Sequence, residues 1–319
     1  MIFTVTLNPA RDRTVMIPGF EAGKVNRIKE TRDDPGGKGI NVSKVIAALG
    51  GTSVAMGILG GQAGHYIQRC LEDMSIECDF VRTNAETRTN IKVVDPERHV
   101  TTDINASGAP ASKRVLSRVY RKLESRAKPG DVVVFAGKLA AGMPPEMLAA
   151  WIRALEQRDV RVFLDADGET LRQGVKAAPY LIKPNEAELS GLLGETLKTP
   201  EEVCRGARRV MEETGVRFVA VSMGADGALF ASGSRAYRGE GLRVNALSTV
   251  GAGDSMMAAL AWGLDAGLPE IDVCRRALAV SAACVTCTGT QTPPPETIQA
   301  LYEQARVLEY NPMKKETEA

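Results

Sequence analysis

The sequence predicts an α/β fold, a doubly wound, mainly parallel sheet with helices on both faces, together with a small antiparallel β lid. Apolar runs bounded by turn residues recur along the chain without the alternation of half-exposed strands, so we expect them to be buried on both faces. Amphipathic segments lie between them, and strand alternating with helix is typical of a parallel sheet. The expected strands cover residues 2–7, 52–60, 131–137, 160–166, 180–185, 217–224 and 227–232.

Two amphipathic segments between these runs, residues 143–159 and 199–215, are expected helices. The second carries start and stop signals. Thr199 precedes Pro200, Glu202 stands at the third helical position, and Gly215 ends the segment. This arrangement is typical of a capping box, a proline in the first turn and a glycine stop.

The lid is predicted from two segments that alternate polar and apolar residues, 12–20 and 87–108, the second forming a hairpin around "DPERH". We therefore expect one α/β domain over residues 1–310, with lid strands inserted at about 12–32 and 87–106. The polar residues 311–319 are expected to form a flexible tail. An exposed lid edge would pair with another lid, which predicts a homodimer.

The composition excludes several classes of function. The chain has 319 residues with 40 basic against 39 acidic ones, so no global charge favours nucleic acid or an anionic membrane. No apolar segment is long enough to span a membrane, and the N-terminus lacks the layout of a signal peptide. Six scattered cysteines then favour reduced thiols in the cytoplasm. Only two histidines are present, so catalysis must rely largely on carboxylates, cationic side chains and backbone groups.

A candidate catalytic site lies in "STVGAGDS", residues 248–255. A helix starting near Asp254 would direct free backbone amides and the positive end of its dipole at one point. Gly251, Ala252 and Gly253 would let a phosphate approach those amides closely. Asp254 could cap the helix. Beside an anion site, however, an aspartate can instead accept the proton of a hydroxyl group.

The segment "STVGAGDS" resembles the signature of the ribokinase-like carbohydrate kinases, and five further motifs follow in the order of that family. The resemblance covers about residues 1–291 and is to the branch that phosphorylates phosphosugars, including 1-phosphofructokinase, tagatose-6-phosphate kinase and a minor 6-phosphofructokinase. The further motifs are "TLNPARD" at 6–12, "PGGKGINVSKVIAALGG" at 35–51, "TRTNIK" at 87–92, "LIKPNEAEL" at 181–189 and "VSMGADGAL" at 221–229.

The resemblance implies where a sugar phosphate binds. Asp12 and Asn41 would hydrogen-bond sugar hydroxyls. Arg88, Asn90 and Lys92 alternate along one strand and would share a face, where cations suit a phosphate. Taken without the resemblance, these residues could equally form a surface turn or a solvated lid face. The glycine-rich loop would close on the sugar through Gly36, Gly37, Lys38 and Gly39.

One position departs from the family pattern. The segment "AGKLAAG", residues 136–142, places Lys138 where similar kinases carry a serine that contacts the substrate phosphate. A lysine can still bind a phosphate as a point charge. We therefore expect Lys138 in the substrate site, and we leave the preferred phosphosugar open.

For the nucleotide, the resemblance places Lys183 and Asn185 near the phosphates of ATP and lets Glu188, with Asn185, hold Mg²⁺ through water. Such an ion keeps several waters and needs few protein ligands. The family also suggests a monovalent cation. The ATP-binding residues include Ser222, Gly224, Ala225, Asp226, Gly227, Thr249 and Gly253.

The resemblance thus implies an ATP-dependent kinase that converts fructose 1-phosphate to the 1,6-bisphosphate, with Asp254 as the base. Tagatose 6-phosphate and fructose 6-phosphate are the alternative substrates. The alternatives from other classes are a non-catalytic sugar-phosphate sensor and a nicotinamide-binding enzyme. A sensor would not need Asp254, Lys183, Asn185 and Glu188 together, and the turn at 36–39 lacks the glycine spacing of a dinucleotide site.

Overall fold

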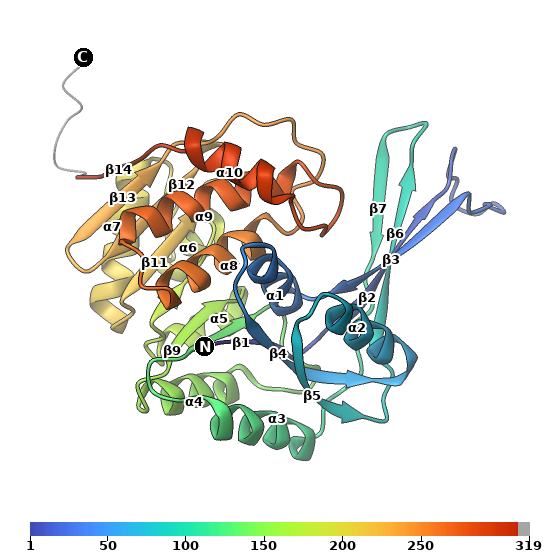
Figure 1. Cartoon of the computed structure of the whole chain (residues 1–319), viewed down its shortest axis with the longest axis horizontal. Helices are drawn as coiled ribbons and strands as arrows, with labels where there is room; N and C mark the ends of the chain where they lie inside the picture. The colour runs from blue at the N-terminus through green and yellow to red at the C-terminus, as the bar shows by residue number, and fades with distance from the viewer. Residues whose placement is uncertain (312–319) are drawn as a thin grey trace.

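The chain folds into a large sheet covered by helices and a smaller sheet that projects from it (Figure 1). The computed structural model describes residues 1–311. The tail predicted for residues 311–319 therefore lies outside the described residues, apart from Asn311.

Ten strands form the large sheet within the described residues. Seven of them pair in parallel with their neighbours, in the spatial order β11, β10, β9, β8, β1, β4 and β5. Strands β12, β13 and β14 extend the sheet beyond β11 by antiparallel pairing. In spatial order the strands are β14 (Val307–Glu309), β13 (Arg235–Gly239), β12 (Ala228–Ser232), β11 (Phe218–Ser222), β10 (Leu181–Ile182), β9 (Arg161–Asp165), β8 (Val132–Ala136), β1 (Ile2–Thr6), β4 (Ser53–Gly60) and β5 (Glu77–Thr83).

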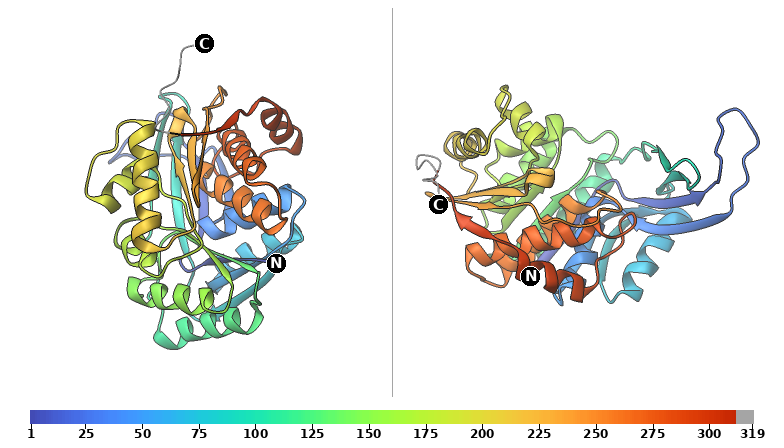
Figure 2. Two further views of the ribbon diagram at one scale, coloured as in Figure 1. Left: turned by 90° about the vertical axis from the view of Figure 1, so that its left-hand side faces the viewer. Right: turned by 90° about the horizontal axis from the view of Figure 1, so that it is seen from above.

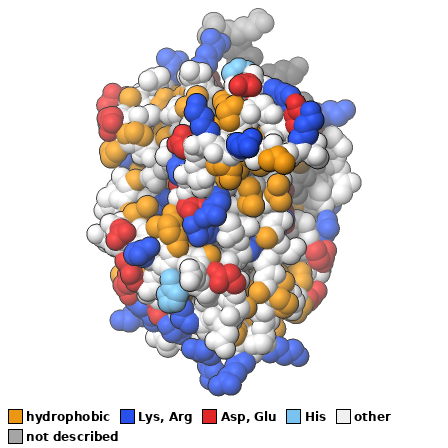
Figure 3. Space-filling view, turned by 90° about the vertical axis from the view of Figure 1, so that its right-hand side faces the viewer, with side chains coloured by type: hydrophobic (Ala, Val, Ile, Leu, Met, Phe, Trp, Pro, Cys, Tyr) orange, Lys and Arg blue, Asp and Glu red, His pale blue; other side chains and the backbone are white. Residues whose placement is uncertain are grey.

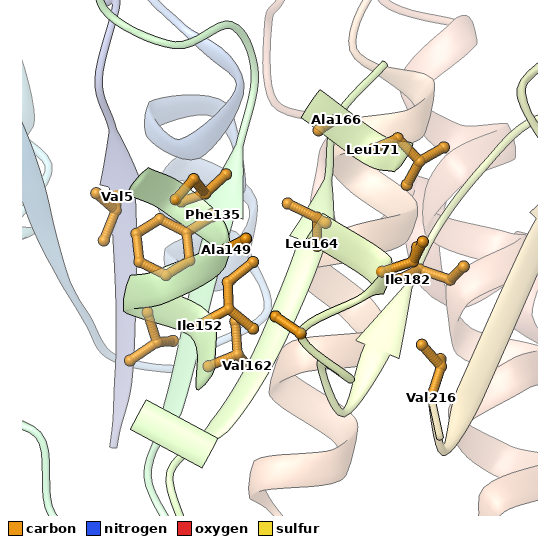
Figure 4. Packing of buried hydrophobic residues seen from close by; sticks show 14 of the residues in the cluster. Val5, Phe135, Ala149, Ile152, Val162, Leu164, Ala166, Leu171, Ile182 and Val216 are labelled. Atoms are coloured by element: carbon orange, nitrogen blue, oxygen red, sulfur yellow. The ribbon is translucent and has the colours of Figure 1, made fainter. Parts of the chain in front are cut away.

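Helices cover both faces of this sheet (Figure 2). On β1, Phe3 and Val5 pack into one hydrophobic core and Ile2 into the other, as expected of a strand buried on both sides. Figure 4 shows part of the first core, where Phe135 lies beside Ile152. The first core contains α3 (Lys113–Arg126), α4 (Pro145–Glu156), α5 (Gly168–Val175), α6 (Glu186–Leu193) and α7 (Pro200–Thr214); the other face carries α1 (Lys38–Ala48), α2 (Gly61–Asp73), α8 (Ala252–Asp265), α9 (Glu270–Val285) and α10 (Pro295–Gln304).

The predicted strands and helices of the main body are confirmed. Each of the seven apolar runs contains a strand, and α7 has the predicted start, a capping box between Thr199 and Glu202. The same helix ends on Gly215 in the left-handed conformation, as the glycine stop requires. Strands β5, β13 and β14 were not predicted.

The small sheet forms the lid, in the order β3 (Glu30–Gly36), β2 (Ala10–Met16), β6 (Arg88–Asp95) and β7 (Val100–Ile104). The hairpin predicted within 87–108 is confirmed as the antiparallel pair β6–β7. The pair β2–β3 is also antiparallel, and the two hairpins join through a parallel pairing of β2 with β6 that the antiparallel prediction did not include. The strand expected over 12–20 ends at Met16, two residues before Pro18, which has no amide to donate. The segment between β2 and β3 extends far from the main sheet (Figures 1 and 2).

This arrangement brings the lid next to the carboxyl ends of β1, β8, β9, β10 and β11, where ligands collect in sheets of this kind. Within the described part of the chain, no helix has the length and apolar character to cross a membrane.

Candidate active site

A cavity of about 1290 Å³ lies at the carboxyl ends of the central strands and below the lid. The strand ends contribute Thr6 of β1, Ala136 of β8, Asp165 of β9 and Ser222 of β11. This volume exceeds the roughly 300–1,000 Å³ of ordinary small-molecule pockets, so the cavity has room for two ligands side by side.

The first turn of α8 faces this cavity and offers an anion site. Gly251 precedes the helix with a φ of +87°, a conformation that favours glycine. Among the described residues, the amides of Gly251 and Gly253 have no hydrogen-bond partner, whereas the Ala252 amide makes a long bond of 3.4 Å to the Thr249 carbonyl. The site expected at residues 251–253 is therefore formed mainly by its two glycines.

Gly253 has a second reason to lack a side chain. A Cβ at this position would lie 3.1 Å from Nζ of Lys183, closer than side chains normally pack. The ammonium group thus approaches the helix start at backbone range. Positive charge from the lysine and from the helix dipole converges on one point.

Asp254 is buried in the wall of this cavity, with 6% of its surface exposed. It does not cap the helix, because the N-cap is Gly251 and no side chain bonds the free amides there. Its Oδ2 accepts a hydrogen bond of 2.8 Å from Nδ2 of Asn41. Burial, followed by the negative charge of Asp165, raises the pKa of Asp254 to about 6, against the lowering effects of Lys38, Asn41 and Lys183.

Asp165 is a central residue that the sequence reasoning did not identify. Its carboxylate is buried between two ammonium groups, 2.9 Å from Nζ of Lys38 and 3.2 Å from Nζ of Lys183. Burial alone would raise the pKa of Asp165, but Lys183 and Lys38 hold it below its usual value. The signal was present, since Asp165 ends a buried strand at the sheet edge where ligands bind.

At the lid end of the cavity, a network of hydrogen bonds joins predicted sugar-binding residues. Nδ2 of Asn90 donates to Oδ1 of Asp12 at 2.8 Å. The guanidinium of Arg88 donates to the backbone carbonyls of Ala106 and Asn8, at 2.7 and 3.1 Å. Arg88 therefore keeps its charge without a carboxylate partner among the described residues, and the network holds it in the cavity wall.

Lys138 lines the same end of the cavity, on the exposed loop after β8. Its ammonium has no hydrogen bond or ion pair to any described residue. Together with Arg88 it forms a second positive region, on lining residues distinct from those at the start of α8.

Four buried polar atoms on residues of the cavity wall make no hydrogen bond within the described residues: Oγ1 of Thr6, Oδ1 of Asn41, Nε of Arg88 and Oδ2 of Asp165. The last of these lies 3.2 Å from Nζ of Lys183, so the atoms on Thr6 and Asn41 are the uncharged ones without a partner. Buried polar groups are normally paired, and a polar ligand in the cavity would give these atoms partners.

Asn185 and Glu188 also line the cavity, at the start of α6. They form a capping box, in which Oδ1 of Asn185 accepts from the Glu188 amide at 2.8 Å and Oε2 of Glu188 accepts from the Asn185 amide at 2.9 Å. Both are also predicted to hold Mg²⁺ through water, and capping the helix leaves the other Glu188 carboxylate oxygen free of these two bonds. In the described residues no group of three or more His, Cys, Asp or Glu side chains could hold a metal ion.

The opposite end of the cavity is more apolar. The predicted ATP-binding residues Ser222, Gly224, Ala225, Gly227 and Thr249 line the cavity there. Aliphatic residues that were not predicted as site residues also line this end: Leu242, Val244, Ala246, Leu278, Ala282 and Val285.

Four predicted residues do not line the cavity. Gly36 lies behind Asp12, where a side chain would collide with the carboxylate, and Gly39 packs against Thr6, whose Oγ1 would lie 2.5 Å from an added Cβ. Asp226 lies in the turn between β11 and β12. Lys92 shares the strand of Asn90, but its Nζ lies 3.7 Å from Asp103. The cavity wall does contain the remaining predicted residues, which are Asp12, Gly37, Lys38, Asn41, Arg88, Asn90, Lys138, Lys183, Asn185, Glu188, Ser222, Gly224, Ala225, Gly227, Thr249, Gly251, Ala252, Gly253 and Asp254.

Comparison with known proteins agrees with this geometry. The 1-phosphofructokinase of Rhodobacter capsulatus is 37% identical, over 98% of this chain and 99% of that protein, and the 1-phosphofructokinase of Haemophilus influenzae is 35% identical over 89% and 91%. Phosphofructokinase-2 from Escherichia coli in complex with potassium superposes with a TM-score of 0.91 at 28% identity, covering 95% of this chain and 98% of that one. The model of the pfkB family of carbohydrate kinases matches residues 6–297. The chain therefore belongs to the pfkB carbohydrate kinase family.

Proposed function

We propose that this protein transfers the γ-phosphoryl group of ATP to fructose 1-phosphate and so forms fructose 1,6-bisphosphate. The observation that carries the proposal is a buried carboxylate, Asp254, directly beside free amides at a glycine-lined helix start, in a cavity with room for two ligands. Similar proteins from several bacteria carry the name 1-phosphofructokinase, which supports the choice of substrate.

Asp254 acts as the general base. A hydroxyl group of the sugar must lose its proton as it attacks phosphorus, and a nearby carboxylate can accept that proton. The raised pKa of Asp254, about 6, makes the carboxylate a stronger base than an exposed aspartate while leaving it mostly ionised at neutral pH. The hydrogen bond from Asn41 keeps the carboxylate oriented.

The start of α8 stabilises the transferred group. Its charge is spread over the phosphoryl oxygens in the transition state, and preorganised donors aimed at those oxygens lower the barrier. The amides of Gly251 and Gly253 and the ammonium group of Lys183 provide such donors. Asp165 holds Lys183 and Lys38 in place by its two ion pairs.

The lid end of the cavity binds the sugar phosphate. Arg88 and Lys138 provide positive charge for the phosphate, and Asp12, Asn90 and Asn41 provide acceptors and donors for the sugar hydroxyls. Tagatose 6-phosphate and fructose 6-phosphate are the alternative substrates, because the same groups would suit them. A structure of Escherichia coli phosphofructokinase-2 in complex with fructose-6-phosphate superposes with a TM-score of 0.89.

ATP would lie with its base at the apolar end and its phosphates toward Lys183. Mg²⁺ would accompany it, and the residues present fit an ion that is bound by few carboxylates and keeps its waters, with Glu188 and Asn185 as the residues that would hold it. When bound, Mg²⁺ would neutralise charge on the phosphates. We also propose a monovalent cation, because one similar structure is a complex with potassium. ATP as a substrate and six cysteines free of disulfides suit the cytoplasm predicted above.

A second copy of the chain is the proposed partner, through the lid. Ile91 and Ile104 are direct neighbours in the β6–β7 pairing, and both are exposed, as is Val100 on the same strand face. Figure 3, drawn from the lid side, shows hydrophobic side chains at the surface among charged ones. Exposed strand edges and apolar lid residues favour pairing of two lids.

The test is an assay of ADP release with a panel of acceptors: fructose 1-phosphate, fructose 6-phosphate, tagatose 6-phosphate and free hexoses. We expect the highest kcat/KM for fructose 1-phosphate and little turnover of free hexoses. A higher kcat/KM for another phosphosugar would correct the substrate. The absence of phosphosugar-dependent ADP release would overturn the proposed kinase activity and favour a sensor.

A further inference from the structure

Lys44 is a buried lysine that the reaction described above does not use. It lies on α1, one turn after Asn41, and exposes 6% of its surface. Its Nζ donates a hydrogen bond of 2.8 Å to the backbone carbonyl of Thr290. No carboxylate in the described residues lies within ion-pair distance of Nζ, so this carbonyl is the specific partner of the ammonium group.

The segment that Lys44 holds, residues 288–291, forms part of the wall of the anion site. Thr290 lines the cavity, and its Cα lies 4.0 Å from the position that a Cβ on Gly251 would occupy. A displacement of this segment would therefore change the space next to the free amides at the start of α8.

The same segment is attached to the lid. Nη1 of Arg32, on β3, donates to Oγ1 of Thr288 at 3.3 Å, and its Nη2 lies 3.0 Å from the position of a Cβ on Gly289. Arg32 is itself oriented by an ion pair of 2.9 Å to Asp34 on the same strand. Residues 288–291 thus contact the lid through Arg32, the sugar side through α1, and the anion site through Thr290.

Burial of an ammonium group is costly, and one hydrogen bond to a carbonyl offsets only part of the cost. A methionine has a similar length and would pack in the same space without that cost. The charge at this position is therefore better explained by the geometry that it imposes than by stability.

We infer that Lys44 is a positioning residue for phosphoryl transfer: through the Thr290 carbonyl it fixes residues 288–291 against the anion site, and Arg32 ties the same segment to the lid. The inference rests on the proposed kinase function. Movement of the lid or of α1 would be transmitted to the helix start where the phosphoryl group is bound.

The experiment compares Lys44→Met and Lys44→Arg with Lys122→Met, a matched change at a helical lysine of α3 that pairs with Asp79 away from the cavity. We expect Lys44→Met to lower kcat about 10- to 100-fold, the effect of a small misplacement near the reacting atoms, with a smaller change in KM for ATP. Lys44→Arg keeps the charge and should recover much of the loss. Lys122→Met should stay within about twofold of the wild type.

Amide hydrogen exchange gives a readout that does not depend on activity. Residues 286–291 should exchange faster in Lys44→Met than in the wild type, and Lys122→Met should leave them unchanged. Lys44→Gln replaces the methionine variant should that fail to fold. Unchanged kcat together with unchanged exchange at 286–291, or a lower melting temperature as the sole effect, would overturn the inference. A wild type without ADP release would overturn the proposed function, while the exchange experiment would still test Lys44.

Discussion

Asp254 and Asp165 are two buried carboxylates of one cavity with opposite pKa shifts. Asp165 lies between the ammonium groups of Lys38 and Lys183, which keep it ionised. Asp254 accepts a hydrogen bond from the neutral amide of Asn41 and forms no ion pair with any described residue, so the effect of burial is the largest and its pKa rises. Environments that separate two carboxylates in this way assign their roles: Asp165 is the counter-ion of the lysines, and Asp254 is free to exchange a proton.

Lys138 is the residue at which substrate preference should be decided. Replacement by serine removes an exposed cavity charge that has no partner among the described residues, so we expect Lys138→Ser to change the ranking of fructose 1-phosphate, fructose 6-phosphate and tagatose 6-phosphate by kcat/KM. The serine variant should keep its thermal stability. Lys113→Ser, at an exposed lysine of α3, is the matched control. An unchanged ranking would show that Lys138 does not select the substrate.

The sequence predicted which single residues line the cavity where those residues belong to a recognisable motif. Asp254, Asn41 and Arg88 were identified from short segments and all line the cavity. Asp165 was missed because "FLDADG" has the pattern of an ordinary strand and turn, and its pairing with Lys38 joins residues that are 127 positions apart. Lys92 was predicted from the motif "TRTNIK" and from strand alternation, and alternation gives the face of a residue and not its distance from the cavity.

At the scale of elements, the anion site at the start of α8 depends on the absence of side chains at its glycines. We expect Gly253→Ala to lower kcat about tenfold or more, because the new Cβ would displace the Lys183 ammonium from the anion site. Stability should stay the same or rise by up to about 1 kcal/mol, since alanine favours a helix more than glycine does.

The matched control for this change is Gly191→Ala in α6, where an added Cβ meets nothing within 4 Å. It should keep full activity and gain similar stability. Steady-state kinetics and thermal unfolding of both variants separate the two effects. Equal activity of Gly253→Ala and the wild type would exclude a close approach of Lys183 to the helix start.

Elements buried on both faces were predicted well. The central strands are runs of Val, Ile, Leu and Phe that fill two cores. The start and end of α7 were predictable because Thr199 caps its N-terminus and Gly215 its C-terminus. Strand β13 reads "RAYRG" and β14 has three residues, so neither carries a pattern that distinguishes it from a loop. Their pairing is set by the neighbouring strand and could not be read from local sequence.

At the scale of the whole molecule, the lid closes one side of the cavity, and residues far apart in the chain meet there. Asp12 of β2, Asn90 of β6 and Asp254 of α8 all line it. Closure of the lid over bound sugar would exclude water, which limits hydrolysis of ATP.

The lid also gives the whole-molecule prediction on assembly. We expect a dimer in sedimentation experiments, and Ile104→Asp should shift it to monomer, because a charge would be buried where two lids meet. Leu308→Asp is the matched control, an exposed apolar residue on β14 outside the lid. A monomeric wild type at micromolar concentration, or a dimer that Leu308→Asp alone disrupts, would refute pairing through the lid.

The central claim is that Asp254 takes the proton of the attacking hydroxyl, and the most direct measurement is kcat of the wild type and of Asp254→Asn as a function of pH. The carboxylate accepts a proton only when ionised, so wild-type kcat should fall as the pH falls through about 6. Asp254→Asn should lose about 10²- to 10⁴-fold in kcat at neutral pH, with ATP affinity nearly unchanged. An asparagine variant that turns over at a rate near that of the wild type would contradict the account.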